Sequence, residues 1–125
     1  MVDNVKLLGD AEYEIIELLQ SLKVPRTESI SIACLLCGEE LTSQTIERSS
    51  GLRQPEVSVA MRPLRERGWV VERNAKKTNG KGRPTKYYKL TVPLGAIIET
   101  FESEILQKNK EVMDSINQLR ELRSG

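Results

Sequence analysis

The stretch LTSQTIERSSGLRQPEVSVAMRPLRERGW, residues 41–69, contains the start and stop signals of two short helices separated by a sharp turn. Thr42 suits the N-cap of the first helix, and Leu41 and Ile46 then have the spacing of a hydrophobic staple. Gly51 supplies the turn, because glycine adopts left-handed backbone conformations without steric cost. This order of signals predicts a helix-turn-helix.

The second helix is predicted over residues 54–67, with proline tolerated in its first turn. Its inward positions, at steps of four and three residues, are Val57, Met61 and Leu64. Pro63 lies inside the helix, where we expect a bend; the alternative is that the helix ends at Arg62. The outward side chains, together with the one just before the helix, are Arg53, Gln54, Ser58, Val59, Arg62 and Arg65.

A β-hairpin is predicted after this helix. Residues 69–73 and 87–92 are rich in β-branched and aromatic side chains, as strands are. Residues 74–86 between them are rich in turn-forming and basic residues, so they predict a long cationic tip. Its cations are Lys76, Lys77, Lys81, Arg83 and Lys86.

Two further helices are predicted before this region. Asp10 is expected to cap the first, which Val24-Pro25 ends because a residue before proline avoids the helical region. Its apolar stripe comprises Ala11, Ile15, Leu18, Leu19 and Leu22. The second is predicted over residues 27–37 with Gly38 as its stop signal, and Ile30, Ala33, Cys34 and Cys37 share one face.

A long helix is predicted over residues 94–122. It carries a seven-residue apolar repeat, widened by neighbouring positions: Leu94, Ile98, Phe101, Ile105, Val112, Ile116 and Leu119. Such a seam predicts packing along another long helix, and therefore a homodimer. The apolar pattern fits a bundle that includes the partner's N-terminal helix as well as it fits a two-stranded coiled coil. The remaining alternative is a helix that folds back on its own domain.

Positive charge is concentrated in one stretch of the chain. Residues 48–89 contain twelve Lys and Arg against three Glu, a net charge of +9, although the 125-residue chain totals only +1. A cationic lobe on a compact motif is typical of a module that binds double-stranded nucleic acid. No apolar run is long enough to span a membrane, and the first residues lack a secretory signal, so we expect a soluble cytoplasmic protein of one ordinary domain.

Histidine is absent, which removes the commonest general base and a common metal ligand, so we predict no catalytic site, metal or cofactor. Cys34 and Cys37 form a C-x-x-C pair. We interpret them as small apolar residues of a buried helix in a reducing compartment. The alternative is a site of four cysteines shared across a dimer.

The residue types match the chemistry of DNA recognition. Arg62 and Gln54 are the candidates for reading guanine and adenine, while Ser58 and Val59 offer a hydroxyl and a contact for a thymine methyl. Arg53 and Arg65 are expected to position the helix, and the phosphate contacts of the preceding helix are expected from Thr42, Ser43 and Gln44. Lysines of the hairpin tip suit phosphates. Lys81-Gly82-Arg83-Pro84 is similar to the AT-hook core and predicts an arginine in a minor groove, the alternative being a charged flexible loop.

Residues 27–92 resemble winged-helix transcriptional regulators of the MarR and TrmB type. The resemblance rests on Leu41-Thr42, Ile46, Ser50-Gly51-Leu52, Val57-Ser58, Met61-Arg62, Leu64, Gly68-Trp69-Val70, Gly82-Arg83-Pro84, Tyr88 and Leu90-Thr91. It implies a homodimeric DNA-binding repressor or activator whose recognition helix is residues 54–67 and whose wing is residues 74–86. The TrmB-type sugar-sensing domain has no counterpart here and Pro63 departs from the pattern, so the resemblance leaves open whether a small-molecule effector binds.

The sequence therefore predicts an α+β winged helix-turn-helix, with a three-helix core and a β-hairpin wing at residues 25–92. Residues 1–24 form an extra helix that supports a dimer, and residues 93–125 form the dimerisation helix. The predicted function is sequence-specific binding of double-stranded DNA by a homodimer on a pseudo-palindromic operator. The rival is an interaction or transcription-machinery scaffold with non-specific nucleic-acid contact, and an enzyme is the third and weakest class.

Overall fold

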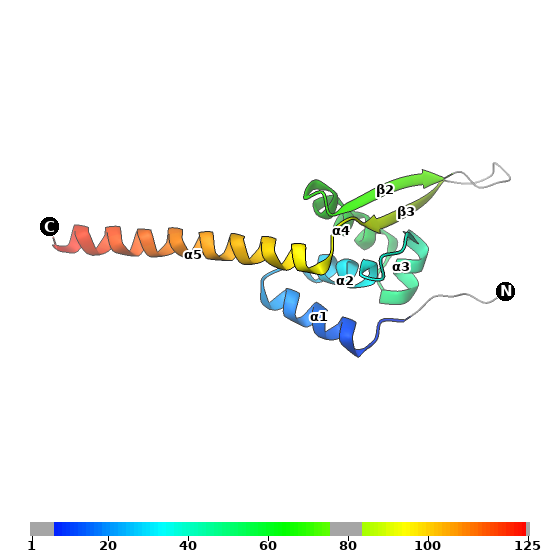
Figure 1. The fold of residues 1–125 in the computed structure, drawn as a ribbon, viewed down its shortest axis with the longest axis horizontal. Coiled ribbons are helices and arrows are strands. Elements are labelled where there is room, and N and C mark those ends of the chain that lie inside the picture. Colours follow the sequence, from blue (N-terminus) through cyan, green and yellow to red (C-terminus); the bar gives the residue numbers. More distant parts are fainter. Residues whose placement is uncertain (1–6, 76–83, 125) are drawn as a thin grey trace. The chain divides into compact units, whose positions relative to one another are not determined.

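The computed structural model describes residues 7–75 and 84–124, and the chain divides into two compact units, residues 1–92 and 93–125 (Figure 1). The elements in chain order are α1 (Asp10–Ser21), α2 (Arg26–Leu35), β1 (Leu41–Thr42), α3 (Ser43–Ser50), α4 (Gln54–Glu66), β2 (Val70–Ala75), β3 (Thr85–Leu90) and α5 (Leu94–Ser124). This is the predicted α+β winged helix-turn-helix, with α3 and α4 as the two helices of the motif.

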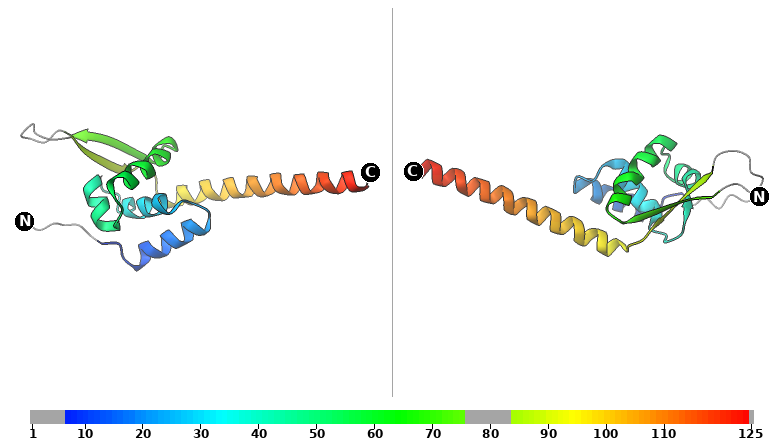
Figure 2. Two further views of the ribbon diagram at one scale, coloured as in Figure 1. Left: turned by 180° about the vertical axis from the view of Figure 1, so that it is seen from behind. Right: turned by 90° about the horizontal axis from the view of Figure 1, so that it is seen from above.

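The core of the first unit lies among its helices. Helix α2 packs against both α1 and α4, and the views in Figures 1 and 2 place it between them. The predicted inward residues of α4 are confirmed, since Val57 and Met61 have no exposed surface and Leu64 is 1 % exposed. Helix α4 also continues through Pro63 to Glu66, so the expectation of a continuing helix holds.

The sheet is antiparallel, with strand order β1-β3-β2. Strand β1 was not predicted, because two residues are too few to show a period of two. Residues directly opposite in an antiparallel pair share one face, so Val70, Leu90 and Tyr88 lie on the buried face. Trp69, just before β2, is 6 % exposed, and the Arg67 guanidinium lies 4.7 Å from its ring centroid.

The ends of α1 differ from the prediction. Gly9 is the N-cap residue rather than Asp10, and its N–H donates to the Glu12 carboxylate at 2.7 Å. At the other end Lys23 adopts φ of 73°, and the N–H of Val24 donates to the Leu19 carbonyl at 3.1 Å. This is a Schellman motif, which ends the helix at Ser21, before Val24-Pro25 is reached.

The apolar stripe predicted for α1 is divided between two faces. Leu19 is buried together with Ile16, which the prediction omitted, because this face packs on α2. Leu18 and Leu22 remain 59 % and 41 % exposed. Helix α1 therefore has a second apolar face that the first unit does not cover.

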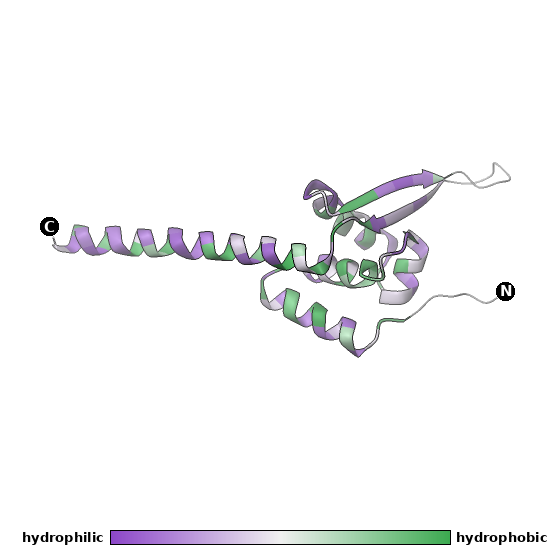
Figure 3. Ribbon diagram, viewed as in Figure 1, coloured by the Kyte–Doolittle hydropathy of each residue, from purple (hydrophilic) through white to green (hydrophobic). Residues whose placement is uncertain are grey.

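Helix α5 comprises 31 residues, two more than predicted. Ile97 and Phe101 are buried. Apolar residues recur along the rest of the helix (Figure 3), and several of them are exposed. Ile98, Val112 and Leu119 of the predicted seam are 50 %, 47 % and 66 % exposed. Across residues 7–75 and 84–124, the helices fall short of the length and apolar character needed to cross a membrane.

Candidate nucleic-acid interface

The first part of the candidate interface is the start of α3. The Thr42 side chain is the N-cap, as predicted: its Oγ1 accepts from the Thr45 N–H at 3.0 Å. The Ser43 hydroxyl donates to the Glu47 carboxylate at 3.3 Å, and Gln44 is exposed. The helix dipole and the backbone N–H groups of a first turn favour an anion, so this end of α3 is chemically suited to a phosphate.

The second part is the outward face of α4. Gln54 is exposed, and its Nε2 donates to the Ser58 hydroxyl at 3.1 Å. Arg62 is exposed one helical turn beyond Ser58, and Val59 between those two residues is 71 % exposed. Hydrogen-bonding groups and an apolar surface therefore alternate on one accessible helix face, which is the arrangement that base-edge recognition requires.

Two of the predicted recognition residues have partners inside the protein. The Arg65 guanidinium lies 3.3 Å from the Glu72 carboxylate, so it links α4 to β2. Ser58 is half-buried and hydrogen-bonds with Tyr88, whose hydroxyl also bonds with Glu72. Burial and the neighbouring Glu72 charge raise the pKa of Tyr88. Ser58 and Arg65 thus link α4 to the β2–β3 hairpin.

The third part is a groove of about 840 Å³ where α3, α4 and the base of the wing meet. It is lined by Ser43, Gln44, Glu47, Gln54, Asn74, Pro84, Thr85 and Lys86. It brings together four residues that the sequence singled out in separate segments, namely Ser43, Gln44, Gln54 and Lys86. Asn74 and Lys86 are opposite each other in the β2–β3 register, so both lie on the sheet face shared with α4.

Asn74 and Thr85 were missed as individual residues, although both fall within the predicted wing. Neither side chain carries a charge, so the positive charge of the wing does not single them out as phosphate contacts. The strand register would have identified Asn74, because it pairs with Lys86. The other predicted wing cations, Lys76, Lys77, Lys81 and Arg83, lie outside the described residues.

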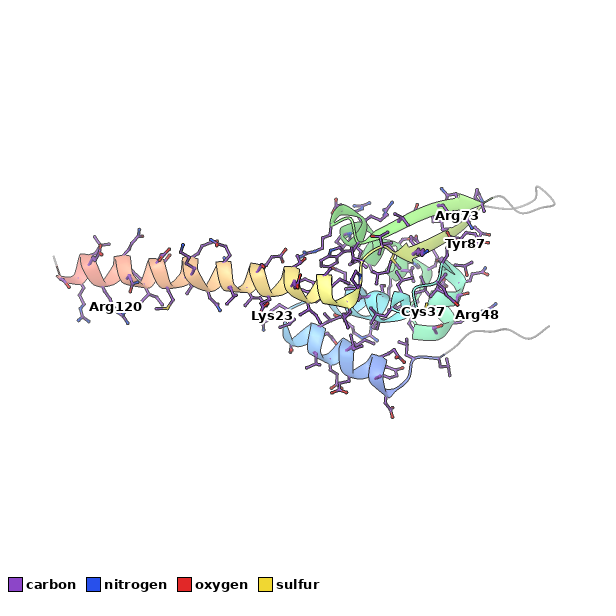
Figure 4. The ribbon with its side chains drawn as sticks, viewed as in Figure 1. Lys23, Cys37, Arg48, Arg73, Tyr87 and Arg120 are labelled. Atoms are coloured by element: carbon purple, nitrogen blue, oxygen red, sulfur yellow. The ribbon has the colours of Figure 1, made fainter. Side chains whose placement is uncertain are left out.

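Arg73 belongs to the opposite face of the hairpin, where Figure 4 labels it beside Tyr87. Its Nε and Nη2 donate to the two Glu40 carboxylate oxygens at 2.6 and 2.7 Å, and its guanidinium lies 4.2 Å from the Tyr87 ring centroid. The hydrogen bond from Arg73 lowers the pKa of the Glu40 carboxyl. Because this cation is paired with Glu40, the charge of +9 counted along residues 48–89 overstates the free positive charge of the lobe.

The cysteines differ in their environment. Cys34 is 6 % exposed in α2, whereas Cys37 is exposed just beyond the end of that helix, and both are free thiols. Burial first, and the neighbouring Cys37 second, raise the pKa of Cys34 to about 12. Within the described segments, no three or more His, Cys, Asp or Glu side chains are grouped to hold one metal ion.

Comparison with known structures identifies the fold. TrmBL2, described as an archaeal chromatin protein with a novel mode of DNA binding, superposes on 88 % of this chain with a TM-score of 0.65 and 19 % identity. The chain corresponds to 40 % of TrmBL2. The adhesin competence repressor AdcR from Streptococcus pyogenes aligns with 89 % of this chain and 81 % of its own, with 22 % identity and a TM-score of 0.42.

The likeness to TrmBL2 establishes a shared winged-helix fold, which confirms the resemblance noted in the sequence at the level of fold. No family model and no curated protein sequence matches the chain.

Proposed function

We propose that this chain is a sequence-specific regulator of transcription that binds double-stranded DNA as a homodimer. The observation that carries the proposal is the single groove into which the start of α3, the start of α4 and the base of the wing converge. A major groove admits one α-helix, and α4 offers Gln54, Val59 and Arg62 on its accessible side. The fold shared with a DNA-binding chromatin protein supports the same conclusion.

In this proposal the residues divide into reading and holding groups. Arg62 and Gln54 read base edges, and Val59 contacts a thymine methyl. Phosphates are held by Arg53, by the wing cations, and by Thr42, Ser43 and Gln44 at the start of α3. Ser58 and Arg65 act chiefly by positioning α4, because both already bond to residues of the hairpin.

The homodimer is proposed from the exposed apolar residues of α5. A single helix with Ile98, Val112 and Leu119 about half or more exposed leaves a large apolar surface in water unless another helix covers it. Leu18 and Leu22 on the uncovered face of α1 support the alternative in which the partner's N-terminal helix joins the bundle. Two recognition helices related by a two-fold axis read half-sites about 34 Å apart, so the operator is pseudo-palindromic.

Selection of bound duplexes from a random pool tests this function, with a palindromic consensus as the expected result. Arg62→Ala should cost about 1–3 kcal/mol on the selected site and relax the preference at one position of each half-site. Lys86→Ala is the matched control. It should weaken the binding of all duplexes similarly and lower the salt slope by about one unit per half-site, because one fewer counterion is released there.

If Arg62→Ala lowers affinity equally for selected and random duplexes, α4 only positions the protein. The scaffold interpretation, with non-specific nucleic-acid contact, then replaces the regulator. Absence of any consensus in the selection would lead to the same conclusion.

A further inference from the structure

A second cavity shares no lining residue with the groove described above. Its volume is about 270 Å³, and its walls come from α1, the end of α2, β1 and α3. Both cysteines line it, together with apolar side chains that include Leu8, Leu36 and Leu41. Figure 4 labels Cys37, which marks the end of α2 in this region. The chain's only two thiols therefore face one cavity, although the proposed DNA contact uses neither.

Both cysteines line this cavity and are three residues apart in the chain. Residues three apart on a helical turn have Cβ atoms about 5–6 Å apart, and Leu36 between the cysteines keeps helical dihedrals, with φ of −66° and ψ of −14°. Cys34 is buried, with 6 % of its surface exposed, and Cys37 is open to solvent.

The walls also determine the charge of a suitable ligand. The carboxylates of Glu12 and Glu39 line the same cavity, and no lysine or arginine of the described segments is among its lining residues. A cation is therefore favoured over an anion. Thiolate sulfur is a soft ligand that selects soft metal ions, whereas a structural zinc ion takes four protein ligands.

We propose that this cavity binds one monovalent soft metal cation of the Cu(I) class between the Sγ atoms of Cys34 and Cys37. Two metal–sulfur bonds form and two S–H bonds break, and both protons leave to the solvent. No atom is oxidised or reduced. The complex of one monovalent cation with two thiolates carries one negative charge, where two neutral thiols carried none.

The cavity is connected to the proposed DNA contact through α3. Thr45 and Ser49 of that helix line it, and the Thr45 N–H and hydroxyl are bonded to Thr42, the N-cap of the phosphate-binding end. This part of the inference rests on the proposed function. A negative complex behind α3 disfavours a phosphate at its start, so ion binding lowers the affinity for DNA, and DNA lowers the affinity for the ion by the same factor.

Competition between the full chain and bicinchoninate for Cu(I), under anaerobic conditions, tests the site without DNA. We expect one ion per chain, and at least a 100-fold loss of affinity in both Cys34→Ala and Cys37→Ser. The second variant changes an exposed side chain, so it retains the fold if the buried substitution does not. Arg62→Ala, which removes base reading, should bind Cu(I) like the unaltered chain.

Binding that survives in either cysteine variant overturns the two-sulfur site. Half an ion per chain overturns it as well, because the ion would then be shared by four cysteines across a dimer. Fluorescence anisotropy with a labelled duplex tests the connection to DNA: one equivalent of Cu(I) should weaken binding by about five-fold or more, and Cys37→Ser should abolish the effect. An unchanged duplex affinity with a saturated site overturns the regulatory role.

Discussion

The winged-helix unit buries most of its apolar side chains, whereas most apolar side chains of α5 remain at least partly exposed. Residues far apart in the first unit, such as Ile32, Ile46 and Met61, are completely buried by its own helices and strands. Helix α5 buries only two residues, and it leaves Leu106, Leu119 and Leu122 between 62 % and 77 % exposed. The difference predicts that the first region obtains its stability from its own chain, whereas α5 needs a second surface to cover its apolar residues.

The largest expected effect is on dimerisation, when most of α5 is removed. Truncation after Ser103 keeps the buried Ile97 and Phe101 but removes the seam from Ile105 onward. We expect the dimer dissociation constant to rise by about 1,000-fold or more, equivalent to about 4 kcal/mol, while the winged-helix unit stays folded. Sedimentation equilibrium measures the first quantity and thermal unfolding checks the second. A truncated chain that remains a dimer would place the interface on α1 or the wing.

Two residues of α4 test the self-sufficiency of the winged-helix unit. Met61 is completely buried and Val59 is 71 % exposed on the same helix. Met61→Ala should lower the free energy of unfolding by about 2–5 kcal/mol because it leaves a cavity in the core. Val59→Ala should change it by less than about 0.5 kcal/mol. Urea denaturation measures both free energies. Equal losses in the two variants would contradict the assignment of Met61 to the buried face of α4 and of Val59 to its exposed face.

A charge placed on α5 should distinguish a narrow seam from a broad bundle. Ile105→Lys introduces a cation at a seam position and should weaken dimerisation by about 2 kcal/mol. Leu106→Lys makes the same change at the next residue, which is 62 % exposed and outside the seven-residue repeat. A two-stranded coil tolerates the second change. If both variants dissociate alike, the partner's N-terminal helix belongs to the interface.

The smallest effects concern two carboxylates within the winged-helix unit, and their signs are opposite. The hydrogen bond from Arg73 lowers the pKa of Glu40, so its stabilisation is present at neutral pH and is lost as the pH falls below about 4.5. Burial raises the pKa of Glu28 despite the nearby Arg67, so its ionisation opposes folding as the pH rises. At pH 7, Glu40→Gln should slightly lower the melting temperature and Glu28→Gln should slightly raise it. Both differences should shrink at pH 3, and shifts of the same sign would refute this explanation.

Sequence reasoning succeeded where one local signal determines the structure. The Thr42 cap, the buried residues of α4 and the continuation of that helix past Pro63 depend on neighbours a few positions away. Chain-local spacing also identified the seven-residue repeat of α5, whose Ile98, Val112 and Leu119 are exposed, and its role in dimerisation stays a prediction.

The errors arose where distant segments compete for a residue. Leu18 fits the apolar stripe of α1 as well as Leu19 does, and only the packing on α2 decides which of them is buried. Arg73 and Glu40 are 33 residues apart, so their ion pair has no sequence signature. The groove depends likewise on the register of β2 with β3, which brings Asn74 opposite Lys86.

Trp69 gives the winged-helix unit an optical signal of its own. It is the only tryptophan of the chain, and it is buried in the winged-helix unit under the Arg67 guanidinium. Its fluorescence therefore reports the unfolding of that unit alone. Far-ultraviolet circular dichroism reports both regions, because α5 supplies 31 of the 74 helical residues in the described parts of the chain. If the denaturation curves from the two probes do not coincide, they separate two transitions without any label or mutation. In the proposed dimer the melting of α5 depends on protein concentration, whereas the unfolding of the winged-helix unit does not.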